Sequence, residues 1–235
     1  MSAAPSSPPP RAVLRATGLT RTFGAGDRAV HALREVDLEV RPGEVVVVRG
    51  RSGSGKTTLL HTLGGLEPPD TGSITLGDHH LSALTEPELL RLRRDVIAFV
   101  FQSFGLLPVL SAAENVEVPL RLQEVPAAER MTRAAAALDA VGLTPHARQR
   151  PGELSGGQQQ RVAVAGALVA RPAVLLADEP TAQLDSETAV AVMEAVLGYV
   201  HGAGALAVVT THDPLIAERA DRVLELHSGR LVPAG

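Results

Sequence analysis

Four short runs of the chain are almost wholly apolar and rich in β-branched residues, as strands buried on both faces of a parallel sheet are. Segments with a helical pattern lie between them, so that strand and helix alternate as in an α/β fold. The predicted strands are residues 45–48, 97–101, 174–177 and 206–210, and the predicted helices include residues 56–63, 86–95 and 188–200.

The N-terminal part of the chain has a different pattern. Residues 13–17, 29–33 and 36–40 alternate more strictly between apolar and polar side chains and are linked by Gly and Asp. This alternation predicts a smaller antiparallel sheet beside the core. From about residue 103 to 165 the strand pattern is missing, and residues 127–141 are Ala-rich with high helix propensity. We therefore expect a helical lobe inserted between core strands.

The length and the apolar stretches limit the domain organisation. The 235 residues suffice for one domain, residues 12–235, with the lobe as a subdomain. Residues 1–11 are expected to be a flexible tail, because residues 1–10 are rich in Ser, Pro and Ala and have neither a basic start nor an apolar core. The longest small and apolar stretch, residues 162–170, is much shorter than the roughly 18 to 20 residues of a membrane-spanning helix. A cytoplasmic location is expected.

The composition excludes some kinds of chemistry. The chain has no cysteine, which rules out disulfides, thiolate nucleophiles and zinc sites with cysteine ligands. A net charge of −4, one tyrosine, four phenylalanines and no tryptophan argue against a general nucleic-acid surface, and no nucleic-acid partner is expected. Of the 22 basic residues all but Lys56 are arginine, so this one lysine is informative.

A glycine-rich loop joins the first core strand to the helix of residues 56–63 and matches the phosphate-binding pattern G-x-x-x-x-G-K-[ST]. Glycines let backbone N–H groups point inward, Lys56 neutralises phosphate charge, and the Thr57 hydroxyl suits Mg²⁺. In this position a simple helix-capping turn is the weaker interpretation. The predicted phosphate-binding residues are Gly50, Arg51, Ser52, Gly53, Ser54, Gly55, Lys56, Thr57 and Thr58. The fold is thus predicted to be a P-loop NTPase core.

Two adjacent carboxylates, Asp178 and Glu179, follow the predicted strand 174–177. Neighbouring residues on a strand point in opposite directions. Asp178 is therefore predicted to serve Mg²⁺ through water, and Glu179 to orient the water that attacks the phosphate. By itself the pair would equally fit a solvated acidic turn before Pro180.

A third motif gives the chain a resemblance to a known family. Residues 154–158 read Leu-Ser-Gly-Gly-Gln and resemble the signature motif of ABC ATPases, at the place in the chain where that family has it. The residues can also cap and open a helix, with Ser155 as the cap. In the family this segment contacts the γ-phosphate bound by the other protomer. The resemblance thus implies a homodimer held by ATP, with Ser155, Gly156, Gly157 and Gln158 in the nucleotide site.

The resemblance covers about residues 13–232 and implies further roles. Gln102 would contact Mg²⁺ or the lytic water, and His212 would hydrogen-bond the γ-phosphate and Glu179. Asp185 would lie in the loop that connects the two sites of the dimer, and Phe23 would stack on adenine. A single His or Phe is more often structural, and only the position of these two favours a role. Two positions depart from the family pattern, Gln183 in place of Asn and Gly166 in place of Arg.

Two other polar clusters give weaker evidence for a function. His79 and His80 are expected in a loop, and as neighbours they would point apart, which argues against a metal site. The arginines at positions 91, 93 and 94 are expected to form a solvated helix face.

The segment from Phe99 to Pro108, with Glu114, Asn115 and Pro119 after it, resembles the lipoprotein-release and macrolide-export branch. The resemblance implies a separate integral-membrane permease as partner, a groove near Gln102 that receives it, and a peripheral position on the inner face of the cytoplasmic membrane. A module that drives a membrane regulator of cell-wall enzymes without transport remains an alternative. A chromosome or DNA-repair ATPase would need a coiled-coil or zinc insertion, and a ribosome-associated factor would need a second cassette.

Overall fold

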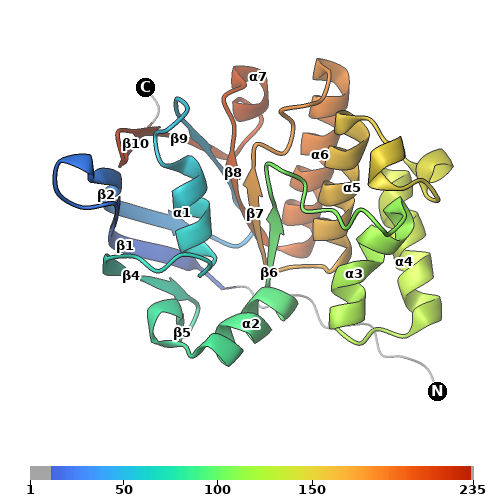
Figure 1. Ribbon diagram of the computed structural model, residues 1–235, viewed down its shortest axis with the longest axis horizontal. Coiled ribbons are helices and arrows are strands. Elements are labelled where there is room, and N and C mark those ends of the chain that lie inside the picture. The colour runs from blue at the N-terminus through green and yellow to red at the C-terminus, as the bar shows by residue number, and fades with distance from the viewer. Residues whose placement is uncertain (1–11, 234–235) are drawn as a thin grey trace.

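The computed structural model describes residues 12–233, which form two β-sheets and a helical lobe (Figure 1). The tail expected for residues 1–11 lies outside this range. The larger sheet has the strand order β10-β9-β3-β8-β7-β6 and is parallel except for the edge strand β10. The predicted parallel α/β core is confirmed. Its strands are β3 (Val45–Arg49), β6 (Ile97–Val100), β7 (Val174–Asp178), β8 (Leu206–Thr210), β9 (Arg222–His227) and β10 (Arg230–Pro233).

The smaller sheet is antiparallel, as predicted, with the order β2-β1-β4-β5. Its strands are β1 (Leu14–Phe23), β2 (Val30–Val40), β4 (Thr71–Leu76) and β5 (His79–His80). Two of the three predicted segments, 29–33 and 36–40, belong to one strand and not to two. A bulge lies between them, where Glu35 has a φ of +52° and the pairing with β1 shifts register.

The loop expected at His79 and His80 is wrong. These residues form β5 and pair with Leu76 and Thr75 of β4, with both side chains exposed. No strand pattern is visible in the sequence here, because the strand is only two residues long and both side chains are exposed.

Helices cover both faces of the larger sheet (Figure 1). Helix α1 (Lys56–Leu63) lies between the two sheets and buries Leu59, Leu60 and Leu63 in an apolar cluster shared with both. Helices α5 (Gly156–Val169) and α6 (Ser186–Ala203) pack on the other face. Strands β3, β7 and β8 are buried on both faces, which is why their sequences are continuous apolar runs without polar alternation.

The helical lobe consists of α3 (Ala112–Leu122), α4 (Ala127–Ala140) and one face of α5, around a separate apolar cluster. Helix α5 contributes Val162 and Ala165 to the lobe but Ala163 and Val164 to the sheet. The helix runs past residue 165, the expected end of the lobe, and Gly166 does not interrupt it. A movement of the lobe therefore involves a helix that is also part of the core.

The remaining elements are short or peripheral. Helix α2 (Glu86–Asp95) begins and ends at the predicted residues, while α6 is longer than the predicted 188–200. Arg91 and Arg94 of α2 are exposed, as expected for a solvated helix face, but Arg93 is largely buried and bonds to Gly65 O and Glu86. Within residues 12–233 no helix is long and apolar enough to cross a membrane. The other helical elements are η1 (Gly26–Arg28), η2 (Leu81–Ala83), η3 (Thr144–His146), η4 (Pro151–Glu153) and α7 (Pro214–Ala217).

Candidate nucleotide site

The carboxyl ends of four parallel strands place the predicted residues along one edge of the larger sheet. Strand β3 leads into the glycine-rich loop, β6 ends two residues before Gln102, β7 ends at Asp178, and β8 ends two residues before His212. In open α/β sheets, ligands bind at this edge.

One cavity of about 690 Å³ brings most of these residues together. Within the glycine-rich loop only Ser54 does not line it, because this residue is buried and its carbonyl oxygen accepts from Gly229 N. Among the predicted residues, Phe23, Gly50, Arg51, Ser52, Gly53, Gly55, Lys56, Thr57, Thr58, Gln102, Asp178, Glu179 and His212 line the cavity.

The glycine-rich loop turns sharply into α1. Gly55 has a φ of +107°, and a Cβ at this position would collide with the carbonyl group of Ala32. Lys56, the first residue of α1, turns back over the loop and donates to the carbonyl oxygens of Gly50 and Arg51, at 2.7 and 3.3 Å. The loop, the amino end of α1 and an ammonium group therefore border the same cavity, an arrangement that binds phosphate.

Asp178 is held by a hydroxyl on each side. Thr57 Oγ1 donates to Asp178 Oδ2 at 2.6 Å, and Thr210 Oγ1 donates to Asp178 Oδ1 at 2.6 Å. The carboxylate is buried, at 5 % relative exposure. The Asp178 carboxylate, at the end of β7, thus connects the start of α1 to the end of β8.

Glu179 leaves β7 in a left-handed conformation, with a φ of +50°. Its carboxylate accepts from His212 Nδ1 at 2.9 Å and lies 3.8 Å from Lys56 Nζ. The side chains of Glu179 and Lys56 are each only 10 % exposed, whereas that of His212 is 69 % exposed. A carboxylate therefore faces the cavity beside the lysine predicted to bind phosphate, with an exposed histidine as its hydrogen-bond partner.

Phe23 lies at the end of β1, where its ring is 41 % exposed and borders the cavity together with Val30. The Arg21 guanidinium covers the ring, 4.9 Å from its centroid. Asp70 and Glu67 hold this guanidinium by ion pairs, and Asp70, the stronger influence, raises the pKa of Arg21. The ring predicted to stack on adenine is thus in contact with a guanidinium that two carboxylates hold in place.

The signature residues lie in a second concavity, of about 320 Å³, lined by Ser155, Gly156, Gly157, Gln158 and Asp185 among others. Within residues 12–233 the two concavities share no lining residue. Ser155 caps α5 by accepting from Gln158 N at 3.2 Å. Asp185 caps α6 by accepting a hydrogen bond from the Thr188 backbone N–H. This bond, and to a lesser extent a bond from the Thr188 hydroxyl, holds the pKa of Asp185 below its usual range. The chain therefore contains two separate groups of predicted nucleotide-binding residues.

Three residues of the site were not predicted: Thr210, Gln160 and Arg21. Thr210 was detectable as a polar residue at the carboxyl end of an apolar strand. Gln160 lies three and four residues before Ala163 and Val164 on a buried face of α5. Arg21 had no signal, because its partners Glu67 and Asp70 are far along the chain.

Comparisons with known proteins identify the family. The profile described as ABC transporter matches residues 33–182. The lipoprotein-releasing system ATP-binding protein LolD 1 of Rhodospirillum rubrum is 44 % identical over 96 % of this chain and 100 % of its own length.

The chain belongs to the ABC transporter family.

It is an ABC ATPase, and its relatives also include the macrolide export ATP-binding/permease protein MacB of Brucella melitensis, 46 % identical over 94 % of this cassette. The cassette spans only about a third, 34 %, of that longer protein. A dimeric structure of the ATP-binding cassette MJ0796, in a post-hydrolysis state bound to ADP and Pi, superposes with a TM-score of 0.89. It is 39 % identical and covers 93 % of this chain and 96 % of its own. The predicted fold class, ATP binding and ATPase activity are confirmed by these matches.

Proposed function

We propose that this chain is the ATP-hydrolysing subunit of an export or extrusion system of the lipoprotein, macrolide or peptide type. It drives a separate integral-membrane permease from the inner face of the cytoplasmic membrane. The similarity to LolD 1 carries this proposal, because it covers 96 % of this chain and all of that relative, which is an ATP-binding protein of a lipoprotein-releasing system.

The active unit is a homodimer that encloses ATP between two copies. The separation of the two concavities supports this, because one chain supplies the glycine-rich loop in one place and the helix cap at Ser155 in another. Two copies placed head to tail bring each loop opposite the other's signature residues. The similar cassette MJ0796 is dimeric. ATP then acts as part of the interface, and hydrolysis weakens the contact.

Glu179 orients the attacking water in this proposal. Its carboxylate is at the carboxyl end of β7, faces the cavity and is held by His212. His212 bonds to the carboxylate through Nδ1, and a bond to the γ-phosphate would use Nε2–H as the donor, with both ring nitrogens carrying hydrogen. Gln102 borders the same cavity from the end of β6 and completes the group around the water. Lys56 neutralises the phosphate charge.

Mg²⁺ fits the group formed by Thr57, Asp178 and Gln102. All three offer oxygen atoms, which are the ligands that Mg²⁺ prefers. The Thr57 hydroxyl and the Asp178 carboxylate are already within hydrogen-bond distance of each other, 2.6 Å. Thr57 and Gln102 would bind the ion directly, and Asp178 through water. When bound, the ion would neutralise charge on the β- and γ-phosphates.

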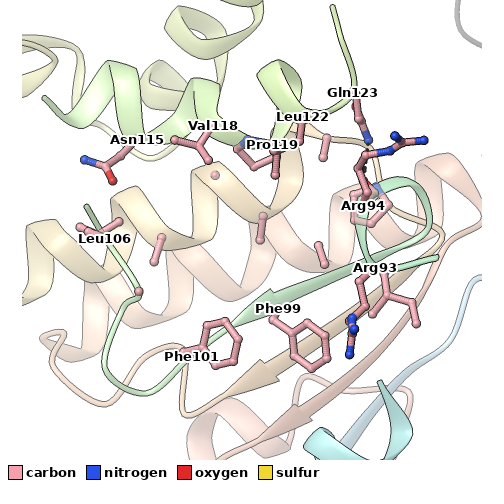
Figure 2. Close-up of a pocket in the computed structure, with 18 of the residues that line it drawn as sticks. Arg93, Arg94, Phe99, Phe101, Leu106, Asn115, Val118, Pro119, Leu122 and Gln123 are labelled. Atoms are coloured by element: carbon pink, nitrogen blue, oxygen red, sulfur yellow. Dashed lines mark hydrogen bonds between the residues drawn. The ribbon is translucent and has the colours of Figure 1, made fainter. Parts of the chain in front are cut away.

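A groove between the lobe and the sheet is the proposed docking site of the permease (Figure 2). Phe99 and Phe101 stack at its floor, with ring centroids 5.4 Å apart and planes at 7°. Leu107 and Leu122, at 47 % and 60 % exposure, add apolar surface at its rim. The groove adjoins Gln102, so an occupant can respond to events in the nucleotide cavity.

Co-purification tests the proposal. The chain is expressed with the integral-membrane protein encoded beside it, and the complex is isolated in detergent through a tag on that protein. Leu122→Asp should abolish capture and the transport-linked ATPase, since it puts a charge into the groove. Met131→Asp is the matched control, because Met131 is equally exposed at 64 % on α4 but does not line the groove. Capture of both variants, or no membrane protein with the wild type, contradicts the proposal.

A further inference from the structure

The chain changes direction in a tight turn that begins at Glu179, directly after β7. Glu179 has a φ of +50° although it is not a glycine and precedes Pro180. A residue before proline normally adopts an extended conformation, and left-handed non-glycine residues cost energy unless the surroundings hold them. The Ala182 N–H donates to the Glu179 carbonyl oxygen at 3.2 Å and closes a turn over residues 179–182.

One buried amide holds both ends of this turn. Gln160 Nε2 donates to the Glu179 carbonyl oxygen at 2.6 Å, and Gln160 Oε1 accepts from Gln183 N at 3.0 Å. The Gln160 side chain comes from α5, which is a different element, and the residue is only 1 % exposed. At the other side of Glu179, its N–H donates to Thr210 O and Oγ1, each at 3.1 Å. The carboxylate therefore projects from a backbone that is fixed at both peptide groups.

The same amide connects the turn to the signature residues. Gln160 lies in the second turn of α5, the helix that Ser155 caps. A Cβ on Gly156 would collide with the side-chain amide of Gln183, and one on Gly157 would lie 2.9 Å from Gln183 O. The backbone after the turn thus packs directly on the amino end of α5. Within one chain, the turn and the signature residues form one hydrogen-bonded unit.

We propose that Gln160 is a positioning residue for hydrolysis, which holds the turn at Glu179 so that its carboxylate reaches the attacking water. This inference rests on the proposed role of Glu179. Gln160 lines neither of the two concavities among the described residues and so acts through Glu179 and not on ATP. Because the turn is joined to the signature residues of the same chain, the carboxylate of one site moves with the surface that closes the other.

Gln160→Met tests the proposal, since methionine has a similar length and volume but cannot make the two hydrogen bonds. We expect kcat to fall about tenfold to a hundredfold, as displacement of a catalytic group by about 1 Å does. The Kd for ATP should stay within about twofold. Gln159→Met is the matched control, because the Gln159 amide bonds only to Leu154 O among the described residues, at 3.1 Å, and it should keep kcat.

A second measurement separates positioning from a general loss of structure. In the Glu179→Gln background, Gln160→Met should leave the ATP-dependent dimer intact by size-exclusion chromatography and slow the residual turnover no further. Loss of that dimer, an equal fall in kcat for both glutamine variants, or normal kcat in Gln160→Met overturns the inference. If Glu179→Gln alone does not slow hydrolysis, it is the proposed role of Glu179 that fails.

Discussion

Thr57 and Asp178 are 121 positions apart in the sequence, yet the hydroxyl of the first donates to the carboxylate of the second at 2.6 Å. The hydrogen bond joins the amino end of α1 to the carboxyl end of β7. It places two oxygen-bearing side chains, the proposed ligands of Mg²⁺, beside the glycine-rich loop. Removal of the Thr57 hydroxyl should therefore weaken the effect of Mg²⁺ on the affinity for ATP and leave binding without Mg²⁺ unchanged.

Thr57→Val keeps the shape of the side chain and removes the hydroxyl. We expect Mg²⁺ to increase the affinity for ATP in the wild type but at most weakly in this variant, while binding in EDTA is unchanged. A competition assay with a fluorescent ATP analogue, with and without Mg²⁺, measures this. Thr62→Val is the control, since Thr62 lies in the same helix and its hydroxyl bonds only to Thr58 O among the described residues. An equal response to Mg²⁺ in both variants contradicts the assignment.

Glu179→Gln removes the negative charge proposed to orient the water but keeps the size of the side chain. We expect turnover to fall at least about a hundredfold, with ATP still bound. The trapped ATP should then hold two chains together, visible as an ATP-dependent shift in size-exclusion chromatography. Turnover near the wild-type level would rule out this role for the carboxylate.

The sequence predicts the core well because the relevant physics is local. Strands β3, β7 and β8 appear as apolar runs. The glycine-rich loop follows β3 and Asp178 ends β7, so the order of strand and polar end is visible without any structure. The hairpin of β9 and β10 was missed because β9 is only partly buried and the edge strand β10 is mostly exposed, so neither has an apolar run of that kind.

The contacts of the site were less predictable, because they join positions far apart in the chain. The capping of Asp178 by Thr210, the clamp of Gln160 on Glu179, and the support of Phe23 by Arg21 each depend on tertiary packing. An isolated threonine, glutamine or arginine carries no pattern for such a contact. The hydrogen bond between His212 and Glu179 was expected only from the family resemblance, and the structure contains it.

Phe23→Ala should weaken binding of ATP about tenfold, the size of effect typical for loss of one base-stacking ring. Binding of inorganic tripolyphosphate should not change, because this ligand has no base. Lys56→Ala provides the contrast, since loss of its charge-assisted contact should weaken both ligands. Isothermal titration with each ligand measures the two effects. If Phe23→Ala weakens tripolyphosphate as much as ATP, the ring acts on the fold and not on the base.

Ser155→Arg should allow each chain to bind ATP but prevent the closed dimer, because a long cationic side chain would fill the surface that meets the partner's phosphate. The substitution also removes a helix cap, which costs about 1 kcal/mol of stability on its own. Ser111→Arg controls for that loss. Ser111 caps α3 with the same reciprocal arrangement as Ser155 on α5, but among the described residues it lines neither concavity of the nucleotide site. Both variants should therefore melt at similarly lowered temperatures. Only Ser155→Arg should lose the ATP-dependent dimer and, with it, efficient hydrolysis, since the glycine-rich loop of one chain would lack the second half of its site.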